Sequence, residues 1–431
     1  MIAQKVMVMS ERQIDVAIIG GGPAGLSAAI ALKQAGVLSI TVLEREDQAG
    51  GIPRHCGHPP FGMREFNRVL TGPAYAKKLV QTALAAGVEI RTRTSVVKAL
   101  PGGTLLVTGN NGSEEISARR VIYATGVRET PRSAQLISGS RPLGVMNTGA
   151  LQSMVYLKNR QPFKRPVIVG SELVSFSAIA TCRHLGIRPV AMIEQAYRVT
   201  ARWPVGLFAR LTGVPLHLDT RLVAIVGDKQ VSGVEIETCA MRGQGEDKAG
   251  ERRFIDCDGV ILTGQFTPEA SLARCGHLAI DAGSGGPVVD QYGRCSDPVY
   301  FAAGNVLRPV ETAGWSWNEG RQVAGFVAAD LAGKLPAPDE GFHIICDDPV
   351  IKFAMPQKIA LPFKAPSMEQ IQLRFNDSVK GQLVAVNDKG DIVWKRALNS
   401  HRERRVLVPV RAIIEGRTGG DIRLRVERGR N

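Results

Sequence analysis

The sequence contains few cysteines, none of them closely paired, and no long apolar run. Its seven cysteines are scattered over 431 residues without a C-x-x-C spacing. This argues against a disulfide framework, a C-x-x-C dithiol redox pair and a four-cysteine iron–sulfur cluster. No apolar run reaches the roughly 20 residues that a membrane-spanning helix requires. We therefore expect no transmembrane span.

A cleavable secretion signal is also missing from the N-terminal residues. Residues 1–12 contain one lysine and a short apolar patch, but no apolar segment of the kind that signal peptides carry. Together with the scattered cysteines, this predicts a reducing compartment and therefore a cytoplasmic protein.

The sequence does have an ordinary globular composition with an excess of positive charge. Apolar residues make up 44% and charged residues 22%, and the formal net charge is +14. The length predicts two or three domains. The charge would suit nucleic acid, anionic lipid or an acidic protein partner. Because basic residues occur throughout the chain, a solvated surface is the simpler interpretation, and we expect no nucleic-acid partner.

The most informative stretch is a strand, turn and helix near the N-terminus. Residues 16–19 form a short β-branched apolar run, which is typical of a strand buried on both faces. Gly20, Gly22 and Gly25 then fit G-x-G-x-x-G. The first glycine makes the turn, the second lets the backbone approach a pyrophosphate, and the third lets the helix pack closely. The helix N-terminus directs N–H groups at the phosphates.

A second strand supports this interpretation. Residues 41–44, Thr-Val-Leu-Glu, predict a strand that ends in Glu44, an acid suited to accept from ribose hydroxyls. The pair of strands with the glycine turn therefore predicts a dinucleotide-binding unit, with a glycine-rich turn in some other α/β unit as the alternative.

A later strand, turn and helix repeats the pattern with an altered turn. Gly170 remains, but Glu172 replaces the second glycine and Ser175 the third. A carboxylate at the place where backbone should meet a pyrophosphate opposes dinucleotide binding by its bulk and by its charge. Glu194 ends the next strand and could contact a ribose, although a solvated acid is the simpler role. The altered turn argues against NAD(P)H binding.

Three separated motifs resemble those of the two-dinucleotide-binding-domain flavoproteins, the FAD/pyridine nucleotide-disulfide oxidoreductase superfamily. They are the glycine turn with Glu44, the A-T-G segment at 124–126 and the A-x-G-D-like segment at 299–306. Their order and spacing cover residues 13 to about 335. The resemblance implies an α/β fold with two Rossmann-like dinucleotide-binding domains, the second inserted in the first. It also implies FAD as cofactor and FAD-dependent oxidoreductase activity.

The resemblance also implies which residues bind FAD. Asn305 stands where the family usually has an Asp that accepts from the flavin ribityl chain, and its amide oxygen could do the same. The helix around 318–324 resembles the element whose N-terminus faces the flavin pyrimidine ring, where its dipole stabilises the anionic reduced flavin by about 1–2 kcal/mol. An ordinary helix start is the alternative. The full set is Gly20, Gly22, Pro23, Ala24, Gly25, Glu44, Arg45, Gly51, Val96, Ala124, Thr125, Gly126, Gly304, Asn305, Glu319 and Gly320.

These motifs predict the domain organisation. We expect the FAD-binding domain at 13–160 and 286–340, with an inserted NAD(P)-like domain at 161–285. Residues 345–431 carry short alternating runs and turn residues, which are typical of a small antiparallel β sandwich. Since all flavin motifs precede residue 335, we expect this C-terminal β domain to be dispensable for FAD binding.

The loop at 50–58 holds one cysteine between two histidines. A single thiol cannot cycle an internal disulfide, so Cys56, His55 and His58 leave three interpretations. They could line the reactive face of the flavin and handle a proton, which makes them the catalytic candidates. They could bind a metal, but Cys-x-His lacks a paired second half, and we predict no metal site. They could be structural loop residues.

The segments 50–58, 61–62 and 70–73 look like those of a subgroup of flavoprotein subunits. It includes the FAD subunits of opine oxidase, hydrogen cyanide synthase and hydroxyproline dehydrogenase, and companions of anaerobic-type glycerol-3-phosphate dehydrogenases. The resemblance implies a hetero-oligomeric dehydrogenase in which this chain works with a partner dehydrogenase subunit. Its small-molecule substrate would be an amino acid, opine, amine or similar compound. The alternatives are a stand-alone NAD(P)H-dependent flavin reductase and a structural subunit that uses FAD only for folding.

Overall fold

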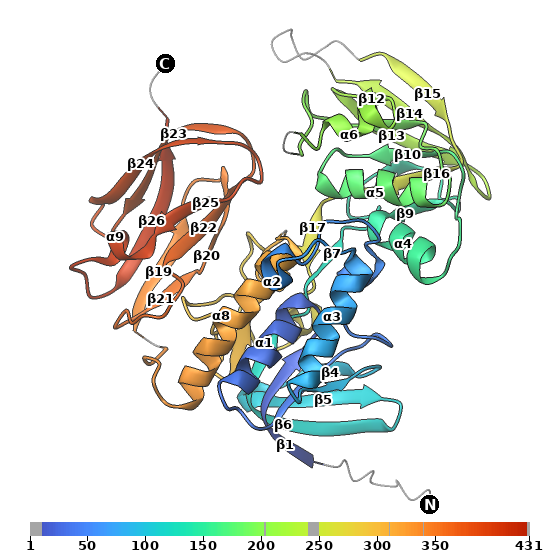
Figure 1. Ribbon diagram of the computed structural model, residues 1–431. Helices are drawn as coiled ribbons and strands as arrows, with labels where there is room; N and C mark the ends of the chain where they lie inside the picture. The colour runs from blue at the N-terminus through green and yellow to red at the C-terminus, as the bar shows by residue number, and fades with distance from the viewer. Residues whose placement is uncertain (1–10, 202–203, 240–249, 310, 339, 429–431) are drawn as a thin grey trace, which may run out of the picture. The chain divides into compact units, whose positions relative to one another are not determined.

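The computed structural model describes residues 11–428 except 202–203, 240–249, 310 and 339. The chain divides into two compact units: Met1–Gly51, Lys78–Val127 and Thr267–Asn431 form the first, and Ile52–Lys77 and Arg128–Phe266 the second (Figure 1). The boundaries expected at 160/161 and 285/286 do not coincide with these and stay predictions. The prediction that residues 1–12 form no secretion signal falls mostly on residues 1–10, which lie outside the described residues.

The first unit contains a mostly parallel sheet with the order β3-β2-β1-β6-β5-β4, and β18 also pairs with β6. The parallel strands are β1 (Glu11–Ile19), β2 (Ile40–Leu43), β3 (Glu89–Arg91), β6 (Gly112–Tyr123) and β18 (Tyr300–Ala302). The antiparallel strands β4 (Ser95–Ala99) and β5 (Thr104–Gly109) complete it. β3 and β4 are separate strands, because Arg93 between them adopts φ 51°.

Two helices of the first unit pack closely on each other. They are α1 (Pro23–Gln34) and α8 (Ala313–Leu331). A Cβ at Gly320 of α8 would lie 2.1 Å from the carbonyl oxygen of Ala24 in α1, so only glycine allows this approach. The strands beneath are fully buried, as in β1, where Val16, Ala17 and Ile18 have no exposed surface. This is why the sequence of β1 is continuously apolar there.

The second unit is built on a parallel sheet with the order β12-β11-β10-β16-β9. Val167 and Ile168 of β10 belong to two different apolar cores, one on each face of this sheet. A second sheet has the order β15-β14-β13-β8. The strands are β8 (Ser138–Gly139), β9 (Val145–Asn147), β10 (Pro166–Val169), β11 (Ala191–Ile193), β12 (Leu216–His217), β13 (Thr220–Gly227), β14 (Val231–Thr238), β15 (Arg252–Asp256) and β16 (Gly259–Leu262).

The remaining elements outside the C-terminal region are short, apart from two helices. Strands β7 (Val127–Glu129) and β17 (Phe266–Pro268) lie where the chain passes between the units. A π-helical turn at Ser153–Leu157 continues α4. The helices are α2 (Met63–Phe66), α3 (Gly72–Ala85), α4 (Thr148–Gln152), α5 (Leu173–His184), α6 (Leu207–Leu211) and α7 (Ser271–Arg274).

The C-terminal region, within the first unit, is a β sandwich over one apolar core. Its sheets have the orders β21-β19-β26-β23-β24 and β20-β22-β25. The β domain is confirmed, but it is not purely antiparallel, because its first strand β19 runs parallel to its last strand β26. Its elements are β19 (Gly341–Cys346), β20 (Ile351–Met355), β21 (Lys358–Ala360), β22 (Gln370–Phe375), β23 (Val379–Val386), β24 (Ile392–Ser400), β25 (Val406–Pro409), α9 (Val410–Ile414) and β26 (Gly420–Glu427).

Candidate functional site

The glycine turn between β1 and α1 has the geometry that a dinucleotide pyrophosphate requires. Gly20 has φ 109°, and a Cβ there would lie 2.5 Å from the carbonyl oxygen of Ala124. A Cβ at Gly25 would lie 2.0 Å from the Gly20 carbonyl oxygen. Gly22 is different, because the nearest atom to its Cβ position is 3.9 Å away. The first and third glycines are thus required by packing, and the second leaves open space beside the helix N-terminus.

Glu44 braces this turn from the end of β2. Its carboxylate accepts from the Gly21 N–H at 2.9 Å and from the Glu46 N–H at 2.9 Å, and the residue is 7% exposed. The Gly50 N–H donates to the Gly21 carbonyl at 2.7 Å. The strand-end acid and the Gly50–Gly51 segment therefore lie against the turn. Of the other expected residues, Arg45 is exposed, and Val96 in β4 is half-buried opposite Val107.

The A-T-G segment is held on both sides. The Ala124 N–H donates to the Ile19 carbonyl at 2.9 Å, which fixes the segment to the end of β1. The Thr125 hydroxyl donates to the Glu269 carbonyl at 2.7 Å, and the Glu269 N–H donates to the Gly126 carbonyl at 2.9 Å. The structure thus brings the first and second motifs together in the first unit.

The third motif also joins this site, and the expected contact of Asn305 with the ribityl chain stays a prediction. A Cβ at Gly304, which has φ 80°, would lie 2.7 Å from the Ala24 side chain. The Asn305 side chain accepts from the Glu311 N–H at 2.8 Å and donates to the Glu311 carbonyl at 3.0 Å. Both ends of the amide are therefore engaged in closing the 305–311 loop, including the oxygen expected to meet the ribityl chain.

The expected start of the following helix is wrong. Helix α8 begins at Ala313 after the N-cap Thr312, so Glu319 and Gly320 lie in its second turn. Glu319 is buried, pairs with Arg308 at 2.9 Å and accepts from the Gly304 N–H at 2.8 Å. Thr312 belongs to a residue class favoured at N-caps and was the local signal for the true start.

The first turn of α8 contains a residue that the sequence did not single out. Ser316 is 6% exposed, and its hydroxyl has no hydrogen-bond partner among the described residues. This oxygen would lie 3.8 Å from a Cβ at Gly304. A buried hydroxyl without a partner costs free energy unless a ligand or water satisfies it. Together with the open space at Gly22 and the N-terminus of α1, it fits the phosphates and hydroxyls of FAD.

The corresponding turn in the second unit keeps its backbone but carries different side chains. Gly170 has φ 108°, and Glu172 caps α5 with φ −74° and ψ 173°. A Cβ at Gly264 would lie 2.2 Å from a carboxylate oxygen of Glu172, so this carboxylate fills the space beside the crossover. The Ser175 hydroxyl bonds the Thr263 hydroxyl at 2.6 Å. Ser175 thus bonds helix α5 to the residue that follows β16. A glycine at this position would instead let the helix pack closer to the strand.

A loop also folds back onto this second turn. The Ala201 N–H donates to the Ser171 carbonyl and the Thr200 N–H to the Ser171 hydroxyl, each at 2.9 Å. The same hydroxyl donates to Glu194 at 2.5 Å. Glu194 is therefore engaged with the turn rather than simply solvated, and polar groups of the turn are already paired within the chain.

Cys56 lies in the second unit at one end of a directional hydrogen-bond chain. Its thiol donates to Gln152 Oε1 at 3.4 Å, and Gln152 Nε2 donates to the Ser177 hydroxyl at 2.7 Å. His58 Nε2 lies 2.6 Å from that hydroxyl, and His58 Nδ1 lies 2.9 Å from the Pro59 carbonyl. Because a carbonyl only accepts, Nδ1 carries the proton and a neutral ring accepts from Ser177.

Burial keeps Cys56 a protonated thiol, although its hydrogen bond to Gln152 acts in the opposite direction. Burial, with a smaller contribution from Glu129, raises the pKa of Cys56 to about 12. A thiol with this pKa is neither a nucleophile nor a ready redox group at neutral pH. Gln152 separates it from His58, and an amide does not relay protons as a titrating side chain does. The geometry favours the structural interpretation of Cys56, and catalytic roles for Cys56, His55 and His58 stay predictions.

The segments that suggested the flavoprotein subgroup fold together. Phe61 and Leu70 form a β-bridge with hydrogen bonds of 2.9 Å in both directions. The Gly72 N–H donates to the Cys56 carbonyl at 3.0 Å, and a Cβ at Gly72 would lie 2.3 Å from that oxygen. A Cβ at Gly57 would lie 2.1 Å from the Tyr156 ring in the π-helical turn. Gly57 and Gly72 are thus explained by close packing within one cluster.

Glu129 is a buried acid near Cys56 that the sequence did not reveal. Its carboxylate accepts from the Gly149 N–H at 2.6 Å and the Thr148 N–H at 3.3 Å, at the start of α4. Burial raises its pKa to about 7, and these two N–H bonds oppose the rise. Glu129 therefore titrates near neutral pH.

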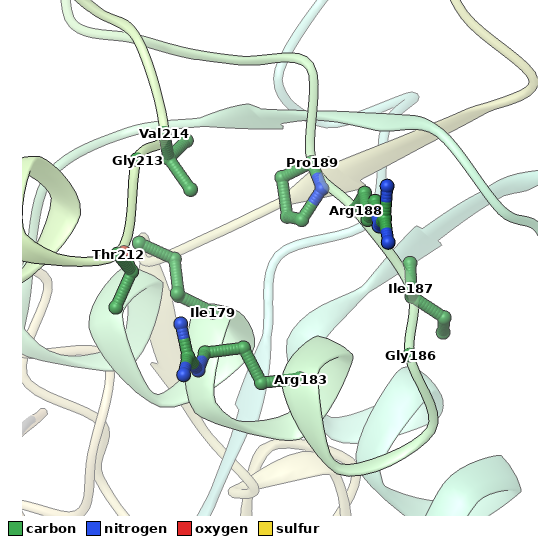
Figure 2. Close-up of a pocket in the computed structure, with 9 residues that line it drawn as sticks. All are labelled: Ile179, Arg183, Gly186, Ile187, Arg188, Pro189, Thr212, Gly213 and Val214. Atoms are coloured by element: carbon green, nitrogen blue, oxygen red, sulfur yellow. The ribbon is translucent and has the colours of Figure 1, made fainter.

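Other site types are not found in the described part of the chain. No group of three His, Cys, Asp or Glu side chains there could hold a metal ion. All seven cysteines are described, and all are free thiols. No described helix has the length and apolar character to cross a bilayer. A pocket of about 380 Å³ lies at the C-terminal end of α5, the opposite end from Glu172, and Arg183 and Arg188 line it with Thr212 and aliphatic side chains (Figure 2).

Comparison with known proteins supports the flavoprotein assignment. Dihydrolipoyl dehydrogenase of Manduca sexta is 22% identical over 68% of this chain and 63% of its own length. An opine oxidase subunit of Agrobacterium tumefaciens (strain Ach5) is 23% identical over 75% of this chain and 64% of its own. The match to these relatives thus spans less than two thirds of their length. Terpredoxin reductase of Pseudomonas sp is 23% identical over 77% of this chain and 78% of its own.

Solved structures agree on the fold. Thioredoxin reductase of T. acidophilum has a TM-score of 0.61 at 23% identity and covers 74% of this chain and 99% of its own. L-proline dehydrogenase of P. horikoshii has a TM-score of 0.54 at 20% identity and covers 76% of this chain and 57% of its own. The pyridine nucleotide-disulphide oxidoreductase family model matches residues 14–320. The chain therefore belongs to this family, whose members bind FAD.

Proposed function

We propose that this chain is the FAD-binding subunit of a hetero-oligomeric dehydrogenase that oxidises an amino acid, opine, amine or similar small substrate and passes the electrons on through the flavin. The single observation that carries the proposal is the second turn, where the Glu172 carboxylate fills the space beside Gly264 and the loop at Thr200–Ala201 bonds to Ser171. Both features oppose dinucleotide binding at this turn. An electron source other than NAD(P)H is then required. For assembly we expect a partner dehydrogenase subunit, and for location the cytoplasm.

The likeness to opine oxidase subunits supports this choice within the family. Those relatives are named as subunits, whereas thioredoxin reductases and dihydrolipoyl dehydrogenase are named as whole enzymes. The seven cysteines are all free, and Cys56 is a protonated thiol, so a dithiol reductase is the less suitable assignment.

The chain's own residues would bind and orient the cofactor, which accepts a hydride or electrons at its flavin ring. The open space at Gly22 and the N-terminus of α1 would receive the pyrophosphate. Ser316 would donate or accept at a buried oxygen of FAD. The N-terminus of α8 would lie near the negative charge that reduction creates, which favours the reduced state.

The test is anaerobic flavin reduction of the purified protein. We expect rapid reduction by the physiological small substrate only with the partner present, and slow or no reduction by NADH or NADPH. Candidate amino acids, opines and amines would be screened with and without the protein encoded beside this chain. Rapid reduction by micromolar NADH would instead assign the chain as a stand-alone NAD(P)H-dependent reductase. If no candidate substrate reduced the flavin even with the partner present, the result would favour a structural subunit that uses FAD only for folding.

A further inference from the structure

One buried carboxylate, Glu311, joins the C-terminal β domain to the segment that starts helix α8. Glu311 is 9% exposed and directly precedes the N-cap Thr312. Arg374 of β22 donates from Nη2 to Glu311 Oε1 at 2.6 Å. Arg405, next to β25, places Nη1 3.6 Å from Glu311 Oε2. Both arginines belong to the β sandwich, whereas Glu311 belongs to the FAD-binding fold.

The same carboxylate is linked to the third flavin motif on its other side. Asn305 holds the backbone of Glu311 through two hydrogen bonds. Arg308 Nε lies 3.9 Å from Glu311 Oε1 and donates to Gln372 Oε1 of β22 at 3.2 Å. The same guanidinium also pairs with Glu319. Glu319 in turn accepts from the Gly304 N–H. A continuous set of contacts therefore runs from the sandwich to Gly304.

The charges in this set depend on one another because they are buried. Arg308 is 3% exposed and Arg374 is 5% exposed. Burial lowers the pKa of Arg374, and the neighbouring Glu311 carboxylate opposes this effect. Removing Glu311 would leave the buried Arg374 guanidinium without its carboxylate partner, which is strongly unfavourable. The arrangement therefore favours the geometry in which Glu311 faces both arginines of the sandwich.

Arg405 makes a second contact that fixes the helix itself. Its guanidinium carbon lies 4.3 Å from the centre of the Trp315 ring, a cation–π contact in the first turn of α8. Trp315 is adjacent to Ser316, the buried hydroxyl that faces Gly304. The sandwich thus contacts both the loop before the helix and the first turn of the helix.

We propose that Glu311, Arg374 and Arg405 are positioning residues through which the C-terminal β domain sets the N-terminus of α8 and Gly304 for FAD. None of the three needs to touch the cofactor. The proposal replaces the expectation that this domain is dispensable for FAD binding. It rests on FAD binding by the family and not on the substrate or partner proposed above, so either proposal can fail without the other.

The test compares full-length Arg374→Met and Glu311→Gln with the control Arg425→Met. Arg425 lies in β26 of the same domain and pairs with the exposed Glu427 of its own strand. We expect the dissociation constant for FAD, from titration of apoprotein by flavin fluorescence, to rise by about tenfold or more in the two variants. We also expect a more negative flavin reduction potential, because the dipole of α8 is no longer held in place.

The double variant Arg374→Met/Glu311→Gln tests whether the two residues act together. We expect its loss of FAD affinity to be smaller than the product of the single losses, because Arg374→Met removes the buried cation that Glu311→Gln leaves without its carboxylate. Thermal unfolding of each apoprotein is measured in parallel. Variants that unfold earlier but keep the FAD affinity and potential of Arg425→Met would overturn the proposal.

Arg405→Met keeps the test decisive if the buried variants fail to fold. The Arg405 side chain is 24% exposed, so its replacement is the mildest of the three. We expect a smaller but measurable loss of FAD affinity and a change in the flavin absorption spectrum. An unchanged spectrum and an affinity equal to that of Arg425→Met would contradict the proposed positioning.

Discussion

The two strand–turn–helix units of this chain have nearly the same backbone and opposite chemistry. Gly20 and Gly170 adopt φ 109° and 108°, and Gly22 and Glu172 cap their helices with φ of −83° and −74°. In the first unit the capping position is open, whereas in the second a carboxylate occupies it. The comparison teaches that the conformation of this turn does not depend on whether the second position is left open or carries a side chain.

Both turns also use the acid at the end of their second strand in a similar way. Glu44 accepts from the Gly21 N–H, and Glu194 accepts from the Ser171 hydroxyl at the equivalent position. The acid therefore supports the turn in both units. What differs is the second and third glycine, so these positions decide whether a dinucleotide can approach.

The largest effect is expected when the first turn receives the glutamate that the second turn carries at the equivalent position. Gly22→Glu should leave the fold intact, because φ is −83° and the Cβ position is open. It should abolish FAD binding, a loss of roughly a thousandfold or about 4 kcal/mol, because a carboxylate then meets the pyrophosphate. Absorbance of the purified protein and FAD titration of apoprotein measure this. Gly22→Ala is the control for bulk alone, and full FAD occupancy in Gly22→Glu would contradict the assignment of the turn.

A second prediction concerns pH and applies to the second unit. The pKa of Glu129 is raised from 4.5 to about 7, so the folded state binds this proton more tightly than the unfolded state. Its contribution to stability is therefore complete below pH 4.5 and is lost as pH rises to 7. The expected loss in the free energy of unfolding is about 3 kcal/mol.

The measurement for Glu129 is a difference between two pH profiles. Glu129→Gln should flatten the fall in stability between pH 4.5 and 7 relative to the unmodified chain, as followed by denaturant unfolding. Glu235→Gln, a substitution on β14 in the same unit, serves as the control for removing one negative charge. Parallel profiles for Glu129→Gln and the unmodified chain would show that the carboxyl does not titrate in this range.

A third prediction sharpens the description of the first site. Ser316→Ala should weaken FAD binding by about 1–2 kcal/mol, since it removes one hydrogen bond to a buried cofactor oxygen. The apoprotein should be as stable as before or more stable, because the hydroxyl has no partner among the described residues. FAD titration and thermal unfolding of apoprotein separate these effects. Ser27→Ala is the matched control, because that hydroxyl on α1 donates to the Ala24 and Trp317 carbonyls. Equal FAD affinity in Ser316→Ala would exclude this contact.

The smallest effect is expected from restoring a single glycine to the second turn. Glu172→Gly should not create NADH binding, because Ser175 still holds Thr263 and the loop at Thr200–Ala201 still covers Ser171. If a variant bound NADH, a concentration one hundred times its dissociation constant for NADH would raise the free energy of unfolding by about 2.7 kcal/mol. We expect no thermal shift of that size in this variant or in the unmodified chain. A shift in the variant alone would show that Glu172 is the sole obstacle.

The parts of the site that the sequence predicted are those governed by local sterics. Gly20 and Gly25 have no room for a Cβ, so the turn can be recognised from residue types alone. The short strands of the C-terminal domain were likewise visible in their alternation, as at Gln370–Phe375. Both depend on neighbours close in the sequence or on a simple period.

The contacts that the sequence did not reveal join residues far apart along the chain. Glu311 meets Arg374 at a separation of 63 residues, and Cys56 meets Gln152 at a separation of 96. No local pattern specifies such pairs. The start of α8 was misplaced for a different reason, since the family likeness of Glu319 and Gly320 outweighed the N-cap signal of Thr312.

The parallel pairing of the first and last strands of the sandwich has a consequence for synthesis. β19 cannot complete its sheet until β26 has been made, although the flavin fold proper ends with α8 at Leu331. At common elongation rates, the residues between Leu331 and Glu427 take roughly 5–20 s to translate. With Glu311 held by this sandwich, a nascent chain would capture FAD firmly only after the segment through Glu427 has left the ribosome.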